Sequence, residues 1–190
     1  MSADGRSEYL VSVSKDRQIG LFRAQPGGEF GLAALVQAAH KRVIWSVSWA
    51  PPATSAALLY FATGGRDGAV RVWTVKPTET AGAEVVCVCT LPLFSAAVTA
   101  VAFAPCLHGG RAALAVGTEA GGISVWEIVP GAGDAPWTSA SRADALLHVR
   151  AIRKLAWRPL PRGISAAPFS QEVASVSEDG AMRILTCRFD

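Results

Sequence analysis

An all-β fold built from repeated antiparallel sheets is predicted by three segments that recur at a constant interval. The segments are VIWSVSWAP (43–51), VTAVAFAP (98–105) and AIRKLAWRP (151–159), and their aromatic residues Trp49, Phe103 and Trp157 follow one another at intervals of 54 residues. An interval of this size is typical of one supersecondary unit stacked several times. Nowhere does the apolar pattern indicate a long amphipathic helix.

Each recurring segment is followed by a pattern that predicts a β-hairpin. Alternating apolar residues run into a polar, glycine-containing turn and out again at 58–73, 113–126 and 173–185, and a fourth copy at 9–22 opens the chain. Weaker apolar strands follow, such as 84–91. Four antiparallel strands per repeat predict the blade of a β-propeller.

The expected strands number three in the first copy, four in each of the next two and three in the last. This amounts to about three and a half blades, an incomplete ring, because closed propellers have about 4–8 blades. Such an open ring is expected to expose two apolar blade faces. We expect a disordered segment at 1–8 and a partial propeller at 9–190, with blade pieces at about 9–39, 40–93, 94–147 and 148–190. We interpret the sequence as the C-terminal part of a longer protein, with a short isoform or a truncated gene model as alternatives.

Polar residues recur at fixed offsets around the predicted turns. Each turn aspartate lies six residues before the last residue of its hairpin and four residues after a serine or threonine. In two copies, a histidine lies nine residues before the tryptophan of the first strand. These offsets resemble the structural tetrad of the WD-repeat family. A partly buried carboxylate needs donors, which an imidazole N–H and turn amides supply. The residues are His40, Thr63, Asp67 and Trp73 in one repeat, His148, Ser175 and Asp179 in the last, and Ser12 and Asp16 in the first.

The tetrad pattern is complete in the second repeat alone. The third repeat has Phe94, Val116 and Ala120 in place of the histidine, hydroxyl and aspartate, and the last has Leu185 in place of the tryptophan. Because the spacing recurs from blade to blade, we interpret these groups as structural and not catalytic. The sequence contains no nucleophile elbow, glycine-rich phosphate loop or Cys/His metal motif, so we expect no enzyme, no cofactor, no metal and no small-molecule substrate.

Several segments further resemble the second subunit of the Elongator complex. They are residues 40–51, 149–157, 10–17 and 115–119, with Ala-Ile-Arg-Lys-Leu-x-Trp as the most specific, and the resemblance covers roughly residues 8–187. It implies a scaffold that holds the largest and the catalytic Elongator subunits, in a complex that modifies the wobble uridine of certain tRNAs. The radical-SAM and acetyl-CoA chemistry would belong to another subunit. Alternatives are a WD-repeat adaptor of a ubiquitin ligase or chromatin assembly, and a protein that binds RNA directly.

The WD-repeat resemblance also implies a partner-binding face. In that family the narrow face uses residues early in the first strand and just before the turn aspartate. The strand positions are Trp45, Thr99 and Arg153, and the turn positions are Lys15, Arg66, Glu119 and Glu178. The candidates are therefore Trp45, Arg66, Lys15, Arg153 and Glu178. Large aromatic residues and arginine dominate interface energies. The alternative interpretation is that Trp45 packs between blades and the charged groups are solvated.

Residues 1–6 are not followed by the apolar core of a secretory signal, so we expect a cytoplasmic protein that is also nuclear. The net charge of +3 is mild and permits a weak tRNA contact. Strand alternation places Arg153 on one face with Leu155 and Trp157, and Arg150 and Lys154 on the other, so we do not interpret them as one phosphate-binding stripe. The longest apolar run, 56–62, is far shorter than the roughly 20 residues that cross a bilayer, so no membrane contact is expected.

Overall fold

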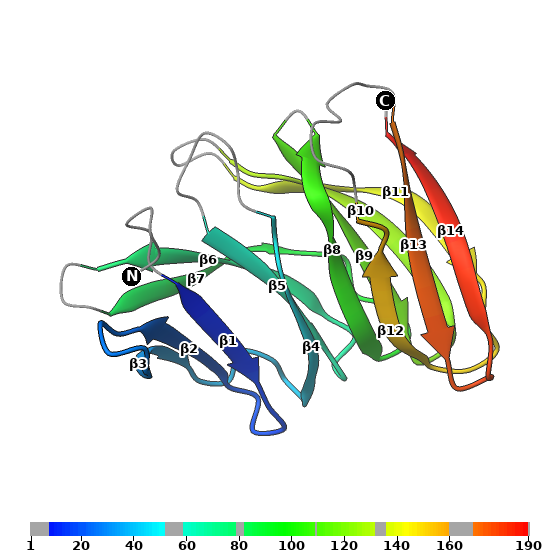
Figure 1. The fold of residues 1–190 in the computed structure, drawn as a ribbon. Coiled ribbons are helices and arrows are strands. Elements are labelled where there is room, and N and C mark those ends of the chain that lie inside the picture. The colour runs from blue at the N-terminus through cyan, green and yellow to red at the C-terminus, as the bar shows by residue number, and fades with distance from the viewer. Residues whose placement is uncertain are drawn as a thin grey trace.

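The computed structural model describes residues 8–51, 59–78, 82–108, 110–131, 136–159 and 169–189. Within these ranges, fourteen strands form four antiparallel sheets (Figure 1). Because residues 1–7 lie outside the described ranges, the expected disordered N-terminal segment is not described. In the described part of the chain, no helix is long and apolar enough to cross a membrane.

The four sheets follow one another along the chain, and we number them 1 to 4. Sheet 1 contains β1 (Tyr9–Val13), β2 (Ile19–Ala24) and β3 (Phe30–Val36). Sheet 2 contains β4 (Ile44–Trp49), β5 (Leu59–Gly65), β6 (Val70–Pro77) and β7 (Ala83–Thr90). Sheet 3 contains β8 (Val98–His108), β9 (Arg111–Thr118), β10 (Gly122–Val129) and β11 (Thr138–Leu146). Sheet 4 contains β12 (Ile152–Trp157), β13 (Phe169–Ser177) and β14 (Met182–Phe189). The predicted all-β class and the predicted three, four, four and three strands are confirmed.

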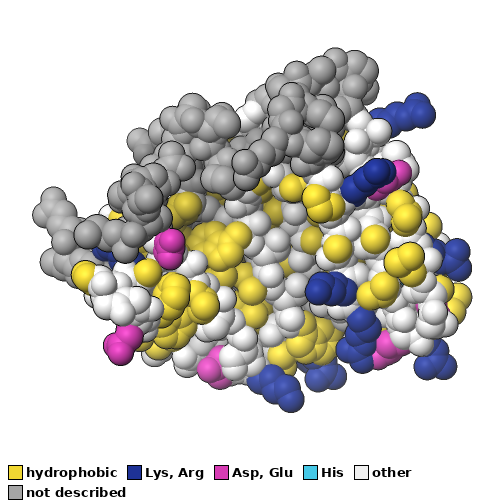
Figure 2. Space-filling view, viewed as in Figure 1, with side chains coloured by type: hydrophobic (Ala, Val, Ile, Leu, Met, Phe, Trp, Pro, Cys, Tyr) yellow, Lys and Arg dark blue, Asp and Glu magenta, His cyan; other side chains and the backbone are white. Residues whose placement is uncertain are grey.

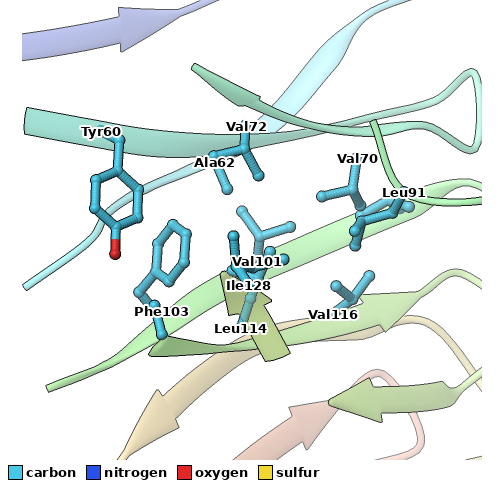
Figure 3. Close-up of a cluster of buried hydrophobic side chains, with 12 residues drawn as sticks. Tyr60, Ala62, Val70, Val72, Leu91, Val101, Phe103, Leu114, Val116 and Ile128 are labelled. Atoms are coloured by element: carbon cyan, nitrogen blue, oxygen red, sulfur yellow. The ribbon is translucent and has the colours of Figure 1, made fainter. Parts of the chain in front are cut away.

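The sheets stand beside one another like the blades of an open fan, and each interface between them holds its own apolar core. Between sheets 2 and 3, Tyr60 and Val72 point toward Phe103 and Leu114 (Figure 3). Middle strands such as β9 are buried along nearly their whole length, because another sheet packs on each of their two faces. Alternation between apolar and polar residues is therefore weak in the middle strands and clearer in outer ones such as β11.

Sheets 2, 3 and 4 each have a β-bulge at the start of their first strand. The register shifts occur between Ile44 and Ser46, between Val98 and Ala100, and between Ile152 and Lys154. A bulge leaves one residue unpaired and redirects its side chain. The unpaired residues in the three bulges are Trp45, Thr99 and Arg153.

The bulge in β12 overturns one expectation from strand alternation. Arg153 was expected on the same face as Leu155, yet Leu155 is buried and Arg153 is exposed beside Lys154. The unpaired residue breaks the period of two, so Arg153 and Lys154 are both solvent-facing.

The two outermost sheets each expose one apolar face, as expected for an open ring. On sheet 1, Leu10 and Leu32 flank Phe22 in register, and both leucines are exposed. On sheet 4, Met182 and Ile184 are exposed along β14. Hydrophobic side chains are visible near both ends of the molecule in Figure 2. Neither face has a neighbouring sheet within the described residues.

Candidate functional site

The second sheet carries a continuous chain of side-chain hydrogen bonds. His40 lies in the β3–β4 connection, Thr63 in β5, Asp67 in the β5–β6 turn and Trp73 in β6. His40 Nδ1 lies 3.0 Å from Asp67 Oδ1, and its Nε2 lies 2.8 Å from Thr63 Oγ1. Trp73 Nε1 donates to the same hydroxyl oxygen at 2.9 Å. The structure thus brings together the four residues whose offsets suggested a tetrad.

The direction of these hydrogen bonds follows from a neutral imidazole. Nδ1–H donates to the Asp67 carboxylate, and Nε2 accepts from the Thr63 hydroxyl, whose oxygen then remains free to accept from the indole. His40 is 2 % exposed. This burial lowers the pKa of His40, against the opposing effect of the Asp67 carboxylate, and the nearby Arg71 guanidinium lowers the pKa further.

The carboxylate of Asp67 accepts several hydrogen bonds in this turn. Its oxygens accept from the backbone amides of Lys41 at 2.9 Å and Ala69 at 3.2 Å, and from Arg71 Nη1 at 3.3 Å. Burial by itself would raise the pKa of Asp67, but the hydrogen bonds from His40 and from the two amides hold it at about 2. Asp67 therefore remains ionised at neutral pH and ties two connections of the blade together.

The fourth sheet repeats this arrangement with three members. His148 Nδ1 lies 2.9 Å from Asp179 Oδ2, and Nε2 lies 2.8 Å from Ser175 Oγ. The backbone amide of Ala181 donates to Asp179 at 2.9 Å, and this bond, together with that from His148, lowers the pKa of Asp179 to about 2. Leu185, which replaces the tryptophan, supplies no N–H to Ser175.

In the first sheet the two candidate residues are not brought together into such a chain. Ser12 and Asp16 are both exposed, and Asp16 accepts from the backbone amide of Gln18 at 2.9 Å. Ser12 lies on the outer face of sheet 1, the face that carries Leu10. No described residue occupies the histidine position for this sheet.

The third sheet has a rewired version of the tetrad. Val116 replaces the hydroxyl, and Trp126 Nε1 instead donates to Ser124 Oγ at 3.0 Å. Phe94, which replaces the histidine, meets Trp126 edge to face with the ring centroids 6.1 Å apart. Sequence reasoning missed Ser124, although a serine two residues before the retained tryptophan was the available signal.

A buried glutamate in sheet 3 was also missed. Glu127 is 8 % exposed, and its carboxylate accepts from Arg142 Nη2 at 2.8 Å and from Arg111 Nη1 at 3.0 Å. The hydrogen bond from Arg142 lowers the pKa of Glu127. Because the three residues lie on β10, β11 and β9, this ion-pair network joins the three outer strands of the sheet.

The candidate partner-binding residues lie along one rim, where the hairpin turns and the starts of the first strands meet. Trp45 is 40 % exposed, so its ring is available at the surface as well as in contact with the blade. Lys15, Arg66 and Glu119 are exposed, whereas Thr99 is half-buried and donates to the Gly117 carbonyl at 3.2 Å. Figure 2 shows several Lys and Arg side chains along the lower edge, where these turns lie in Figure 1. We call this edge the turn rim.

Two of the rim candidates pair with each other. Arg153 Nη2 donates to Glu178 Oε1, and both side chains face solvent. An exposed pair of this kind contributes about 0–1 kcal/mol to stability and leaves both groups available to a partner.

Among the described residues, no group of three or more His, Cys, Asp or Glu side chains could hold a metal ion. The two His–Asp pairs occupy equivalent places in sheets 2 and 4, and each bonds to a hydroxyl of its own sheet. Repetition of the same polar group in equivalent sheets is typical of residues with a structural role.

Comparisons with known proteins agree with this geometry. Residues 34–74 match the family model described as "WD domain, G-beta repeat". A crystal structure of Sqt1 from Chaetomium thermophilum superposes with a TM-score of 0.58 over 88 % of this chain and 36 % of that chain, at 21 % identity. The sheets and their hydrogen-bonded turns therefore define a WD-repeat protein of the β-propeller class.

Relatives at the sequence level are more specific. Elongator complex protein 2 of Dictyostelium discoideum is 32 % identical over 100 % of this chain and 22 % of its own length. The Schizosaccharomyces pombe protein is 34 % identical over 80 % of the chain and 19 % of its own length, and the Arabidopsis thaliana protein 33 % over 95 % and 21 %. The chain is homologous to Elongator complex protein 2, and it spans about a fifth of the length of these relatives.

Proposed function

We propose that this chain serves as a non-catalytic scaffold in the Elongator complex and thereby supports modification of the wobble uridine of tRNA. The observation that carries the proposal is the homology to Elongator complex protein 2 at 32–34 % identity over 80–100 % of the chain. The polar groups provide a physical reason for a scaffold. His40, Asp67, His148 and Asp179 are engaged in hydrogen bonds within their own blades.

The recurring His–Asp–hydroxyl groups act in this proposal as structural clamps. Each ties a turn to the connection that precedes its sheet, because Lys41 and Val149 donate backbone amides to Asp67 and Asp179. The clamps hold the turn rim in place. The rim residues Lys15, Trp45, Arg66, Arg153 and Glu178 are then the contacts for the largest and the catalytic Elongator subunits.

Affinity purification of the full-length form from cells tests the assignment. The largest and the catalytic Elongator subunits are expected to be recovered with it. Recovery of neither, with subunits of a ubiquitin ligase or a chromatin complex in their place, would favour the alternative WD-repeat adaptor.

Substitutions on the turn rim test the proposed contacts. Trp45→Ala and Arg66→Glu should reduce the recovery of those subunits several-fold, because an aromatic anchor and a guanidinium are lost. Lys76→Glu is a matched control, since Lys76 is exposed at the far end of β6. Equal recovery with all three variants would place the contact elsewhere.

A direct tRNA contact is a separate and weaker candidate. The exposed cations Arg150, Arg153 and Lys154 favour it, since the bulge in β12 turns the last two toward solvent together. Binding of tRNA to the purified chain should then weaken steeply as salt rises, because counterions are released when phosphates are neutralised. A flat salt dependence would argue against it.

A further inference from the structure

Loss of the tetrad in sheet 3 opens a cavity at the turn rim. The cavity has a volume of about 410 Å³ and is lined by residues that include Phe94, Thr118, Ala120, Ser124 and Asp144. This volume lies within the range of about 300–1,000 Å³ typical of small-ligand sites. Phe94 and Ala120 stand at the positions of the tetrad histidine and aspartate, so the cavity occupies the place where sheet 2 has its clamp.

The equivalent place in sheet 2 contains an arginine side chain. Arg71 follows Asp67 by four residues, and its Nη1 lies 3.3 Å from the Asp67 carboxylate and 2.8 Å from the His40 ring. Sheet 4 also has an arginine at this position, Arg183, four residues after Asp179. In sheet 3 the corresponding residue is Ser124, which is too short to fill the space. A guanidinium-sized group is thus missing from sheet 3.

The charge of the cavity complements such a group. Among the described residues that line it, Asp144 carries the only charge. Asp144 lies on β11 directly opposite Ser124, and no described residue forms an ion pair with it. A carboxylate can accept two parallel N–H bonds from one guanidinium.

The remaining walls favour a planar cation. The Phe94 ring lines the cavity and is held edge to face against Trp126. Guanidinium groups pack well on aromatic rings, and arginine does so more often than lysine. Exposed Leu146 at the mouth offers an apolar surface to the methylene part of an incoming side chain.

We propose that this cavity is a docking site for an arginine side chain from a partner protein, with Asp144 as its counter-ion and Phe94 as its stacking surface. The site lies on the turn rim, so it would add an anchor to the scaffold surface described above. The partner's identity rests on the proposed function, whereas the preference for arginine rests on the cavity alone.

The test is an NMR titration of the ¹⁵N-labelled chain with the peptide acetyl-Gly-Arg-Gly-amide. The amide signals of Gly121, Gly122 and Ser124 are expected to shift with saturation. The peptides with lysine or norleucine in place of arginine should bind at least about tenfold more weakly, because they lack the planar fork. Absence of shifts at these amides, or equal shifts with all three peptides, would overturn the proposal.

Two variants and a control locate the effect. Asp144→Asn should weaken binding of the arginine peptide by about tenfold or more, since the counter-ion is lost. Glu84→Gln, which removes an exposed carboxylate from the outer strand of sheet 2, should bind as the unaltered chain does. Ser124→Arg should abolish binding by filling the cavity from within. Unchanged binding by Asp144→Asn would contradict the proposed counter-ion.

The titration contains no Elongator subunit, so its outcome is separable from that of the purification. A chain that fails to bind the peptide yet recovers the Elongator subunits would overturn the docking site alone. A chain that binds the peptide but recovers neither subunit would overturn the proposed function alone.

Discussion

Thr63 has a pivotal place in the hydrogen-bond chain of sheet 2, because one hydroxyl serves both a histidine and a tryptophan. It is fully buried, donates to His40 and accepts from Trp73. Burying a hydroxyl costs little free energy when it both donates and accepts a hydrogen bond. The two bonds also polarise and strengthen each other in the low-dielectric interior. The chain ends at Asp67, whose ionised state is maintained by four donors.

Removal of the turn carboxylate in sheet 2 is expected to be costly. Asp67→Ala should lower the free energy of unfolding by about 1–3 kcal/mol, because the buried His40 ring loses its acceptor and two backbone amides of the turn region lose theirs. Denaturant unfolding followed by tryptophan fluorescence measures the change. Asp16→Ala is the control: the exposed Asp16 should alter stability by no more than about 0.5 kcal/mol. Equal effects of the two substitutions would show that Asp67 is merely solvated.

Stability should fall with acid in two windows. The pKa of His40 is lowered from 6.5 in the fold, so below that value the unfolded chain binds a proton that the folded chain does not, and stability declines. The pKa of Asp67 is lowered from 3.8 to about 2, so its contribution is complete above 3.8 and is lost as the pH falls toward 2.

Thermal unfolding at a series of pH values checks the first window. The Tm advantage of the unaltered chain over His40→Gln should narrow between about pH 7 and about pH 5, because glutamine does not titrate. A constant Tm difference across this range would mean that burial does not lower the pKa of His40.

Glycines in the second strands set how closely neighbouring sheets approach. Gly64 in β5 and Gly117 in β9 are equivalent, and each faces a branched residue at the start of the next sheet, Val98 and Ile152. A Cβ on Gly64 would lie 2.5 Å from Val98 Cγ1, and one on Gly117 would lie 2.7 Å from Ile152 Cγ2. The fan can therefore close to this spacing because these strands lack a side chain at the contact.

Adding one methyl group at either contact should destabilise the fold. Gly64→Ala and Gly117→Ala are each expected to cost about 1–3 kcal/mol through overpacking between the sheets. Equilibrium unfolding in urea provides the measurement. Gly27→Ala serves as the control, since nothing lies within 4 Å of a Cβ at that position. A neutral Gly64→Ala would indicate that the sheets can shift apart freely.

The molecule as a whole has two different ends. Internal interfaces pack the tetrad-bearing face of one sheet against the opposite face of the preceding sheet, as Phe61 and Trp73 of sheet 2 do against Ile19 and Leu21. Sheet 1 exposes its tetrad-bearing face, and sheet 4 exposes the opposite kind. Each end thus presents one half of the kind of interface that occurs three times between the sheets of the interior.

The isolated 190-residue chain is expected to self-associate through these ends. Size-exclusion chromatography with light scattering should show a mass that rises with concentration, because contiguous exposed apolar faces attract one another. Leu32→Lys and Ile184→Lys, at 60 % and 61 % exposure on the two end faces, should each reduce the association. Leu93→Lys is the control, because Leu93 is 74 % exposed in the β7–β8 connection, away from both faces. A monomer at every concentration would contradict the expectation.

Much of the architecture could be predicted because the same sequence pattern recurs in each repeat. The 54-residue interval and the alternating hairpins led to the correct number of strands in each sheet. The same offsets grouped His40, Thr63 and Asp67 in one repeat, and the structure places them within hydrogen-bonding distance. Constant offsets work here because each blade is folded from a continuous stretch of chain.

Other features depend on neighbours that lie far away in the sequence. Alternation misplaced Arg153 because a bulge is a property of the pairing between β12 and β13. The cavity beside Asp144 likewise arises from contacts between strands, because its lining residues come from β9, β10, β11 and the segment around Phe94.

Local pattern was thus sufficient to establish that this chain is a series of antiparallel sheets with clamped turns, since period, offsets and turn residues act within one repeat. The pairing of strands and the packing of sheets settled the rest: which side chains the bulges direct to the rim, where a lost clamp leaves a cavity, and which faces lack a neighbour. Those outcomes require atoms from different strands or different sheets to meet, and no short-range pattern encodes such a meeting.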